Sequence, residues 1–295
     1  MSTSNKLSLP AALGRGLRGA MQWRLWLLWI AASLACALLA AIPAWGWLAG
    51  LFNHSVDAGA IAAGKAPDLM MEALMAQPSP LPVVSESAML GAILMLLLSP
   101  LLAGATIAAI RSRGRPGFGD LLRGGIGEYG PMLRMLVWSV VPLGIALMAM
   151  TMILGGNEAA HEHAILASEL EGGRTLAFVV GGLLFALAHA SLEAGRGWIA
   201  ADGRLRSALK AWWRGLKLLL RRPVAVLGAW LVTTALGLLL ALLFAWLRGM
   251  VSPAGFGGFL LALLLGCGIA AGLAWGRIAR LYAMQALAED AHARR

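Results

Sequence analysis

From Leu236 to Leu247 the chain reads LGLLLALLFAWL, and this stretch decides the fold class. It lies in a run without any charged residue between Arg222 and Arg248. Such a run exceeds the ~20 apolar residues that a helix needs to cross a ~30 Å hydrocarbon core. Strands of membrane barrels alternate apolar and polar residues, and this stretch does not alternate. Because lipid cannot hydrogen-bond to the backbone, the stretch is predicted to be a membrane-spanning helix.

Five further uncharged runs reach or approach this length. The six runs lie between Arg24 and His54, Glu86 and Arg111, Arg134 and Glu158, Arg174 and Glu193, Arg222 and Arg248, and Arg248 and Arg277. Only 13% of the residues are charged, against roughly 25% in soluble domains. We therefore predict an all-α, polytopic integral membrane bundle of six transmembrane helices arranged as three hairpins. Residues 1–295 form one membrane domain, with a cytoplasmic or interfacial segment at 1–24, the bundle at 25–280 and a cytoplasmic tail at 281–295.

The distribution of positive charge predicts the orientation of this bundle. All but three of the 24 Lys and Arg residues lie before the first run, after even-numbered runs or after the last; the exceptions are Lys65, Arg174 and Arg248. The positive-inside rule places such segments, and both termini, in the cytoplasm. A net charge of +10 could also indicate nucleic-acid binding, but its confinement to short segments between spans argues against that partner. The predicted location is the inner (plasma) membrane of a bacterium.

A weak threefold repeat supports the three hairpins. Each unit has a basic amphipathic segment that contains a Gly followed by Leu or Ile, at Gly16, Gly125 and Gly215. An Arg follows in each unit at Arg24, Arg134 and Arg222, and then a Trp in the span at Trp29, Trp138 and Trp230.

The third amphipathic segment is the clearest, and cytoplasmic interfacial helices of this kind are part of the predicted fold. Its apolar face has Leu205, Leu209, Trp212, Leu216 and Leu219, and its basic face has Arg206, Lys210, Arg214, Lys217 and Arg221. Asp202 is the expected N-cap, and Pro223 predicts a break before the fifth span. Such a helix lies in the membrane interface with its cations toward anionic lipid. The alternative is that the segment only sets the topology.

His189 is the one ionisable residue well inside a predicted span, and Glu193 lies one helical turn further on the same face. An intramembrane titratable pair is a candidate proton relay or cation site. The alternative is that the fourth span ends early and His189 is a polar packing residue near the interface.

Small residues at a spacing of four mark a helix-packing face in the sixth span, at Gly268, Gly272 and Gly276. The spacing leaves open whether the partner helix belongs to the same chain or to a second copy. Pro43, Pro100 and Pro142 are expected to be kinks or to end spans.

Motifs for catalysis or cofactors are absent from the sequence. There is no P-loop, no Rossmann glycine pattern and no catalytic triad. His161, Glu162 and His163 lack the spacing of a zinc site. We expect no enzyme activity, no cofactor and no metal site.

Two segments resemble a known group. One runs from Ser99-Pro100 and Gly104 through Gly114-Arg115-Pro116 to Leu121-Leu122-Arg123-Gly124-Gly125, and the other from Arg204 to Trp230. They resemble a broad group of uncharacterised bacterial six-span membrane proteins, which includes the membrane domain found fused to glycerophosphoryl diester phosphodiesterases. The resemblance implies an inner-membrane helical bundle. It implies no hydrolase activity, because the phosphodiesterase domain is not in this chain.

The first functional hypothesis is a non-enzymatic membrane component that acts as a scaffold or accessory and engages anionic lipid. A small transporter or channel subunit is the alternative. Such a protein needs polar groups at the midplane of several spans, where His189, Thr233 and Thr234 are nearly the only ones. The partners that remain open are another membrane protein and a second copy of the chain.

Overall fold

The computed structural model describes residues 6–62, 65–75, 81–112, 114–162, 168–252 and 255–294. Within these ranges the regular elements are all helices, and six of them are long and apolar enough to cross a membrane. The chain is therefore an all-α, multi-pass membrane protein, as its uncharged runs predict. The six long helices are α2 (Trp23–Phe52), α5 (Leu81–Arg111), α6 (Phe118–Ala160), α7 (Ser168–Ala201), α9 (Pro223–Gly249) and α10 (Gly255–His292). The short helices are α1 (Leu9–Gly19), α3 (Ala58–Ala62), α4 (Pro67–Met75) and α8 (Ala208–Arg221).

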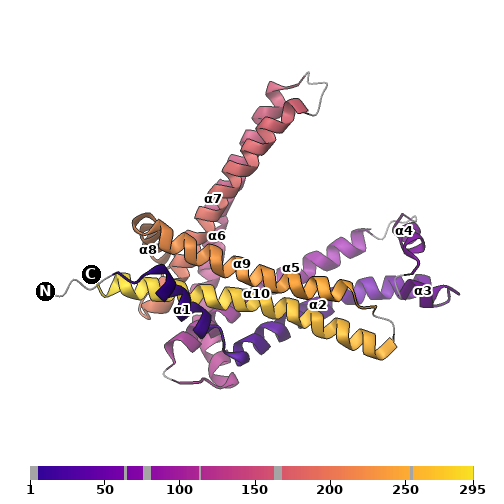
Figure 1. The fold of residues 1–295 in the computed structure, drawn as a ribbon, viewed down its shortest axis with the longest axis horizontal. Coiled ribbons are helices and arrows are strands. Elements are labelled where there is room, and N and C mark those ends of the chain that lie inside the picture. Colours follow the sequence, from indigo (N-terminus) through magenta and orange to yellow (C-terminus); the bar gives the residue numbers. More distant parts are fainter. Residues whose placement is uncertain are drawn as a thin grey trace.

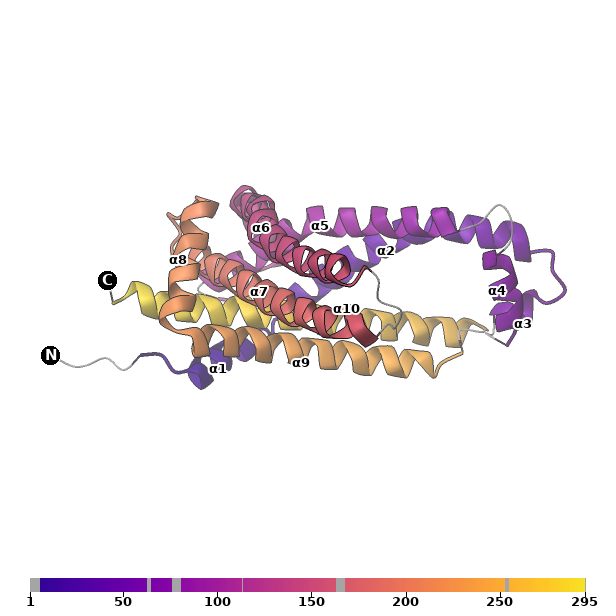
Figure 2. The same ribbon diagram turned by 90° about the horizontal axis from the view of Figure 1, so that it is seen from above.

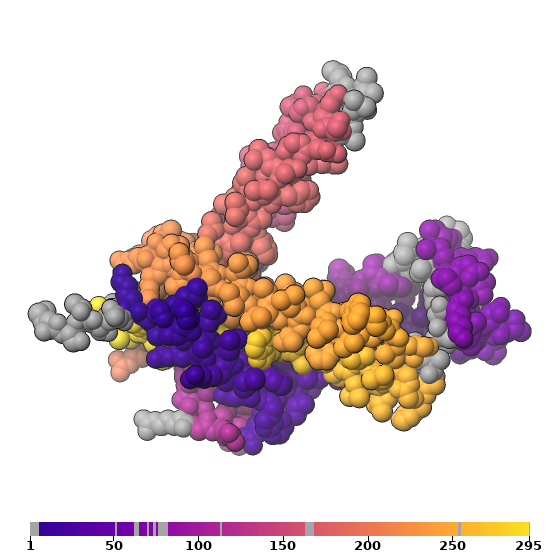
Figure 3. All heavy atoms as spheres, viewed as in Figure 1, coloured from indigo at the N-terminus to yellow at the C-terminus, as the bar shows by residue number. Residues whose placement is uncertain are grey.

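The long helices form three hairpins, α2–α5, α6–α7 and α9–α10, which meet at one end and diverge at the other (Figure 1). Helices α1 and α8 and both ends of the chain lie where the hairpins meet, and Figure 2 shows the same grouping from above. The far half of α6–α7 projects from the rest of the molecule (Figure 3). Its side chains, such as Met152, Phe178 and Leu183, are at least 60% exposed, as expected for a surface whose solvent is lipid.

The glycine in each amphipathic segment joins its hairpin to the preceding hairpin. The first hairpin is joined in this way to the last, so the contacts form a closed cycle. Gly16 packs against the backbone of α10, Gly125 against that of α5 and Gly215 against that of α7. In each case the partner is the second helix of the preceding hairpin. A Cβ atom would lie 2.6 Å from the Ala279 oxygen at Gly16, 2.8 Å from the Leu101 oxygen at Gly125 and 2.5 Å from the Ser191 oxygen at Gly215. No side chain fits at such distances, so the three glycines are required by close helix contact.

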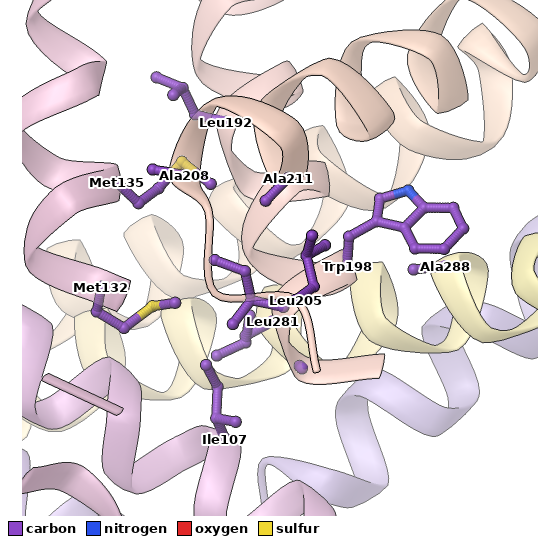
Figure 4. Close-up of a cluster of buried hydrophobic side chains, with 12 residues drawn as sticks. Ile107, Met132, Met135, Leu192, Trp198, Leu205, Ala208, Ala211, Leu281 and Ala288 are labelled. Atoms are coloured by element: carbon purple, nitrogen blue, oxygen red, sulfur yellow. The ribbon is translucent and has the colours of Figure 1, made fainter. Parts of the chain in front are cut away.

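The core lies where the hairpins meet. Figure 4 shows side chains from α5, α6, α7, α8 and α10 gathered in one buried cluster. Ile107, Met135, Leu192 and Trp198 are each 1% exposed or less. This cluster fixes the relative positions of the three hairpins at that end and leaves their far ends apart.

Of the expectations about element boundaries, the cap at Asp202 is wrong, the break at Pro223 is confirmed, and the three prolines are left with the kink as their alternative. Pro43, Pro100 and Pro142 lie inside helices that continue past them, so none of the three ends a span. Asp202 does not cap α8; the N-cap is Ser207, whose hydroxyl accepts a hydrogen bond from the Lys210 amide. The expected break at Pro223 is present, because α8 ends at Arg221 and α9 begins at Pro223.

The helices also extend beyond the predicted segments. The α6 helix runs without interruption through its amphipathic segment into the span. The α10 helix continues to His292, with Met284 and Leu287 fully buried. Much of the expected tail at 281–295 is therefore part of the packed bundle.

Candidate functional site

Glu193 is the centre of a buried ion-pair network. It projects from α7 with only 4% of its surface exposed. Its Oε1 accepts a 2.6 Å hydrogen bond from Arg196 one turn later, and its Oε2 lies 3.4 Å from Nε of Arg280 on α10. The α7 helix therefore continues past Glu193, and the Glu193 carboxylate lies between two arginines.

His189 lies on the same face of α7, and its contacts run to α9. Its Nδ1 accepts a 2.8 Å hydrogen bond from the indole N–H of Trp230, and its Nε2 is 3.8 Å from Glu193 Oε1. Arg280 also reaches α9, where it donates a 2.8 Å hydrogen bond to the Thr234 hydroxyl. His189, Glu193 and Thr234 thus belong to one network that links α7, α9 and α10, whereas the Thr233 hydroxyl donates only to backbone carbonyls of its own helix.

Arg277, one turn before Arg280 on α10, is exposed and is not bonded to this network. Its guanidinium lies 5.4 Å from the centre of the Trp29 ring. Among the described residues it has no hydrogen bond or salt bridge to any acceptor. It lies in the wall of a cavity that Arg196, Arg280 and Glu193 also line.

This cavity has a volume of about 500 Å³ and lies between the hairpins, with walls from α2, α5, α6, α7 and α10. The repeat explains its position. The three repeat glycines contact the carbonyl oxygens of Leu101, Ser191 and Ala279. The residues two positions before these are Ser99, His189 and Arg277. The residues two positions after them are Ala103, Glu193 and Leu281. All six of these residues line the cavity. The three units therefore surround one central space, to which the second and third units supply the charge.

The α8 helix has three faces rather than two. Its buried face, at Ala211, Gly215 and Leu218 among others, packs against the rest of the bundle. A second stripe of Leu209, Trp213 and Leu220 is at least 50% exposed. The basic residues follow on the third face. Leu209 thus does not share the buried face of Leu205 and Leu219, because tertiary packing divides the apolar side in two.

The basic residues of the third amphipathic segment, Arg206 before α8 and four within it, have three kinds of environment. Arg206 lies 3.6 Å from Glu128, and Arg214 forms a 3.0 Å salt bridge with Asp202. Lys217 lies 5.3 Å from the centre of the exposed Trp213 ring. Lys210 and Arg221 are exposed and make no ion pair within the described ranges.

Asp202, expected as a cap, instead anchors the segment before α8. Partial burial, the largest single influence, raises the pKa of Asp202, but hydrogen bonds from the Arg214 guanidinium and the Arg204 amide outweigh it. The pKa of this carboxyl is therefore below its ordinary value, and the ionised form is favoured.

The three glycines of α10 lie against α9 of the same chain. A Cβ atom at Gly272 would lie 2.9 Å from the Ala241 amide nitrogen, and one at Gly276 would lie 2.9 Å from the Thr233 oxygen. At Gly268 the neighbour is the Phe244 ring, at 2.6 Å. The helix partner left open by the sequence is thus, in this structure, α9.

The sequence did not single out Arg196, Arg277 and Arg280 as site residues, because they were assigned to the cytoplasmic positive charge. The only local signal is the spacing of three residues from Glu193 to Arg196. His161 and Glu162 are exposed at the end of α6, and His163 lies outside the described residues.

Comparison with known proteins gives no relative. No protein-family model, curated protein or solved structure matches the chain. The function is therefore argued from the sites described above.

Proposed function

We propose that this chain is a non-enzymatic, multi-pass protein of the bacterial inner membrane that engages anionic lipid with its cytoplasmic end and serves as a scaffold or accessory component. The observation that supports it best is the surface of α8. An exposed apolar stripe of Leu209, Trp213 and Leu220 borders a row of outward cations. Apolar side chains beside lysines and arginines are the pattern of a helix that lies in the headgroup region.

The orientation is supported by the position of the basic segments. Helices α1 and α8 and both chain ends lie at the end where the hairpins meet (Figure 1). With that end in the cytoplasm, the cations of α8 face the leaflet whose anionic lipids attract polybasic segments by about 1 kcal/mol per residue.

The test is affinity purification of the full chain in mild detergent, with co-purifying lipids and proteins identified by mass spectrometry. We expect phosphatidylglycerol to be enriched over phosphatidylethanolamine relative to the membrane of origin. The triple variant Lys210→Gln/Lys217→Gln/Arg221→Gln removes three outward cations and leaves the buried face of α8 intact. Three contributions of about 1 kcal/mol correspond to a loss of affinity of roughly two orders of magnitude. The same enrichment in the triple variant would contradict the role of α8.

A small transporter or channel subunit is the second candidate, and the cavity between the hairpins favours it. Its volume of about 500 Å³ is within the ~300–1,000 Å³ of typical ligand pockets. Purified protein in liposomes, assayed for flux of chloride or phosphate against empty liposomes, separates the two functions. Flux above that background would favour the transporter.

A further inference from the structure

The charges around the central cavity do not balance. Three guanidinium groups, those of Arg196, Arg277 and Arg280, line it, and Glu193 is its one carboxylate. Arginine stays protonated in proteins. Arg280 is buried and Arg196 is half-buried, whereas Arg277 lines the cavity with an exposed side chain. Charges removed from water are normally paired, because an unpaired ion in a low-dielectric interior costs several kcal/mol. The cavity thus has two positive charges more than its own carboxylate can neutralise.

The hydrogen bonds show which donors lack an acceptor: Arg280 donates from one guanidinium nitrogen to Thr234 but not from its Nε, and Arg277 makes no hydrogen bond to a described residue. Glu193 is occupied by Arg196 at 2.6 Å and approached by Arg280 at 3.4 Å. Arg280 is 8% exposed, and its Nε has no hydrogen-bond partner. Arg277 has the Trp29 ring alone, with no acceptor in the described part of the chain. These donors belong to planar forks that match phosphate and carboxylate oxygens.

The cavity is also amphipathic along its length. Its charged residues correspond, in the repeat, to α5 positions from Ser99, the counterpart of Arg277, to Thr106, the counterpart of Arg196. The wall continues along α5 to Ala92, Met95 and Leu96, in the direction in which the hairpins diverge. Ser99 lies seven positions after Ala92, which at 1.5 Å per residue is about 10 Å of helix. A compact inorganic anion would fill only the charged end.

We propose that this cavity binds one anionic phospholipid, with its phosphate at Arg277 and Arg280 and an acyl chain along the α5 wall between the diverging hairpins. The site is distinct from the surface contact of α8 and does not depend on it. The phosphate supplies the missing negative charge, and the chain covers the apolar wall.

The test uses the full chain, stripped of lipid in detergent and titrated while bound species are counted by native mass spectrometry. The probes are phosphatidylglycerol, phosphatidylcholine and inorganic phosphate. Arg277→Gln removes the cation without a protein acceptor, so it leaves no carboxylate unpaired. Arg248→Gln is the matched control, an exposed arginine at the opposite end of α9. We expect one tightly bound phosphatidylglycerol, weakened at least about tenfold by Arg277→Gln and unchanged by Arg248→Gln.

A second variant tests the apolar arm independently of the charges. Ala92→Trp places a large ring in the α5 wall, about 10 Å along the helix from the level of Arg277. It should weaken the binding of phosphatidylglycerol without altering the weak binding of inorganic phosphate. The α8 triple variant should retain the tightly bound lipid, which separates this site from the surface contact. Equal affinity for phosphatidylglycerol and phosphatidylcholine would overturn the proposal. So would wild-type affinity in folded Arg277→Gln, or inorganic phosphate binding as tightly as the lipid.

Discussion

The substitution Gly272→Leu tests how α9 and α10 are held together. At Gly272 even a Cβ atom would lie 2.9 Å from the Ala241 amide nitrogen and 3.1 Å from Leu240 Cβ. The first neighbour is backbone and cannot rotate away, so the two helices must separate. Gly266 lies on the same helix, and a Cβ added there meets nothing within 4 Å. Gly266→Leu is therefore the matched control.

The magnitude follows from two opposing effects. Inserting methylenes into a packed contact costs about 1–3 kcal/mol. Replacing glycine by a good helix former returns up to about 1 kcal/mol in a helix interior. Gly266→Leu has only the gain, so its melting temperature in detergent should equal or exceed that of the parent. Gly272→Leu has both effects. Its unfolding free energy should be lower than that of Gly266→Leu by about 1–3 kcal/mol, and its melting temperature should be correspondingly lower.

The assay is thermal unfolding in one detergent, followed by circular dichroism and by size-exclusion chromatography of the unheated samples. Gly268→Leu should have an intermediate effect, because its neighbour is the side chain of Phe244, which can turn. Melting of Gly272→Leu at the temperature of Gly266→Leu would refute the packing argument. Loss of a larger assembly with the monomer intact would instead make the stripe a contact between copies of the chain.

Three further predictions concern topology, the buried carboxylate and pH. Reporter fusions after Arg206 and at the C-terminus should report cytoplasm and fusions near Lys65 and Glu169 the outside; a cytoplasmic signal at Glu169 would remove the third and fourth spans. Glu193→Gln leaves the arginines without their carboxylate and should cost about 3–5 kcal/mol in unfolding free energy, whereas the exposed Glu169→Gln should melt like the parent. Because the pKa of Asp202 is lowered in the folded state, its contribution is present above the ordinary carboxyl pKa and is lost as pH falls through the lowered one. Amide exchange in α8 should accelerate over that acidic range in the parent and lose this dependence in Asp202→Asn; identical pH profiles would contradict the anchor.

The spans were predictable from sequence because crossing a bilayer imposes a requirement on each segment separately. The run from Pro223 to Leu247 has enough uncharged residues for a span, and α9 occupies it. The three hairpins followed in the same way from the order of the runs. The repeat glycines were visible too, at Gly16, Gly125 and Gly215. Their partners were not, because each lies on a helix of another hairpin.

The site was only half predictable for the same reason. His189 and Glu193 were conspicuous because a polar pair inside an apolar run is unusual. Arg277 and Arg280 lie more than 80 residues further along the chain, at the basic end of the last span. A count of charges assigns them to the cytoplasmic surface. Only the packing of α10 against α7 brings Arg280 to Glu193 and places Arg277 in the wall of the same cavity. The structure likewise divides the apolar side of α8 between a buried and an exposed stripe, which helical periodicity alone cannot do.

The depth of α8 in the membrane tests the proposed lipid contact most directly. A nitroxide placed by Leu220→Cys, in a Cys36→Ser/Cys267→Ser background, would report from a side chain that is 72% exposed. In nanodiscs that contain phosphatidylglycerol, oxygen should reach the label more readily than an aqueous nickel chelate does, at a depth of about 5–10 Å. A label at Gly203→Cys, in the exposed turn before α8, should remain in water. A Leu220 label that is as accessible to nickel as the Gly203 label, in both anionic and neutral nanodiscs, would contradict the account.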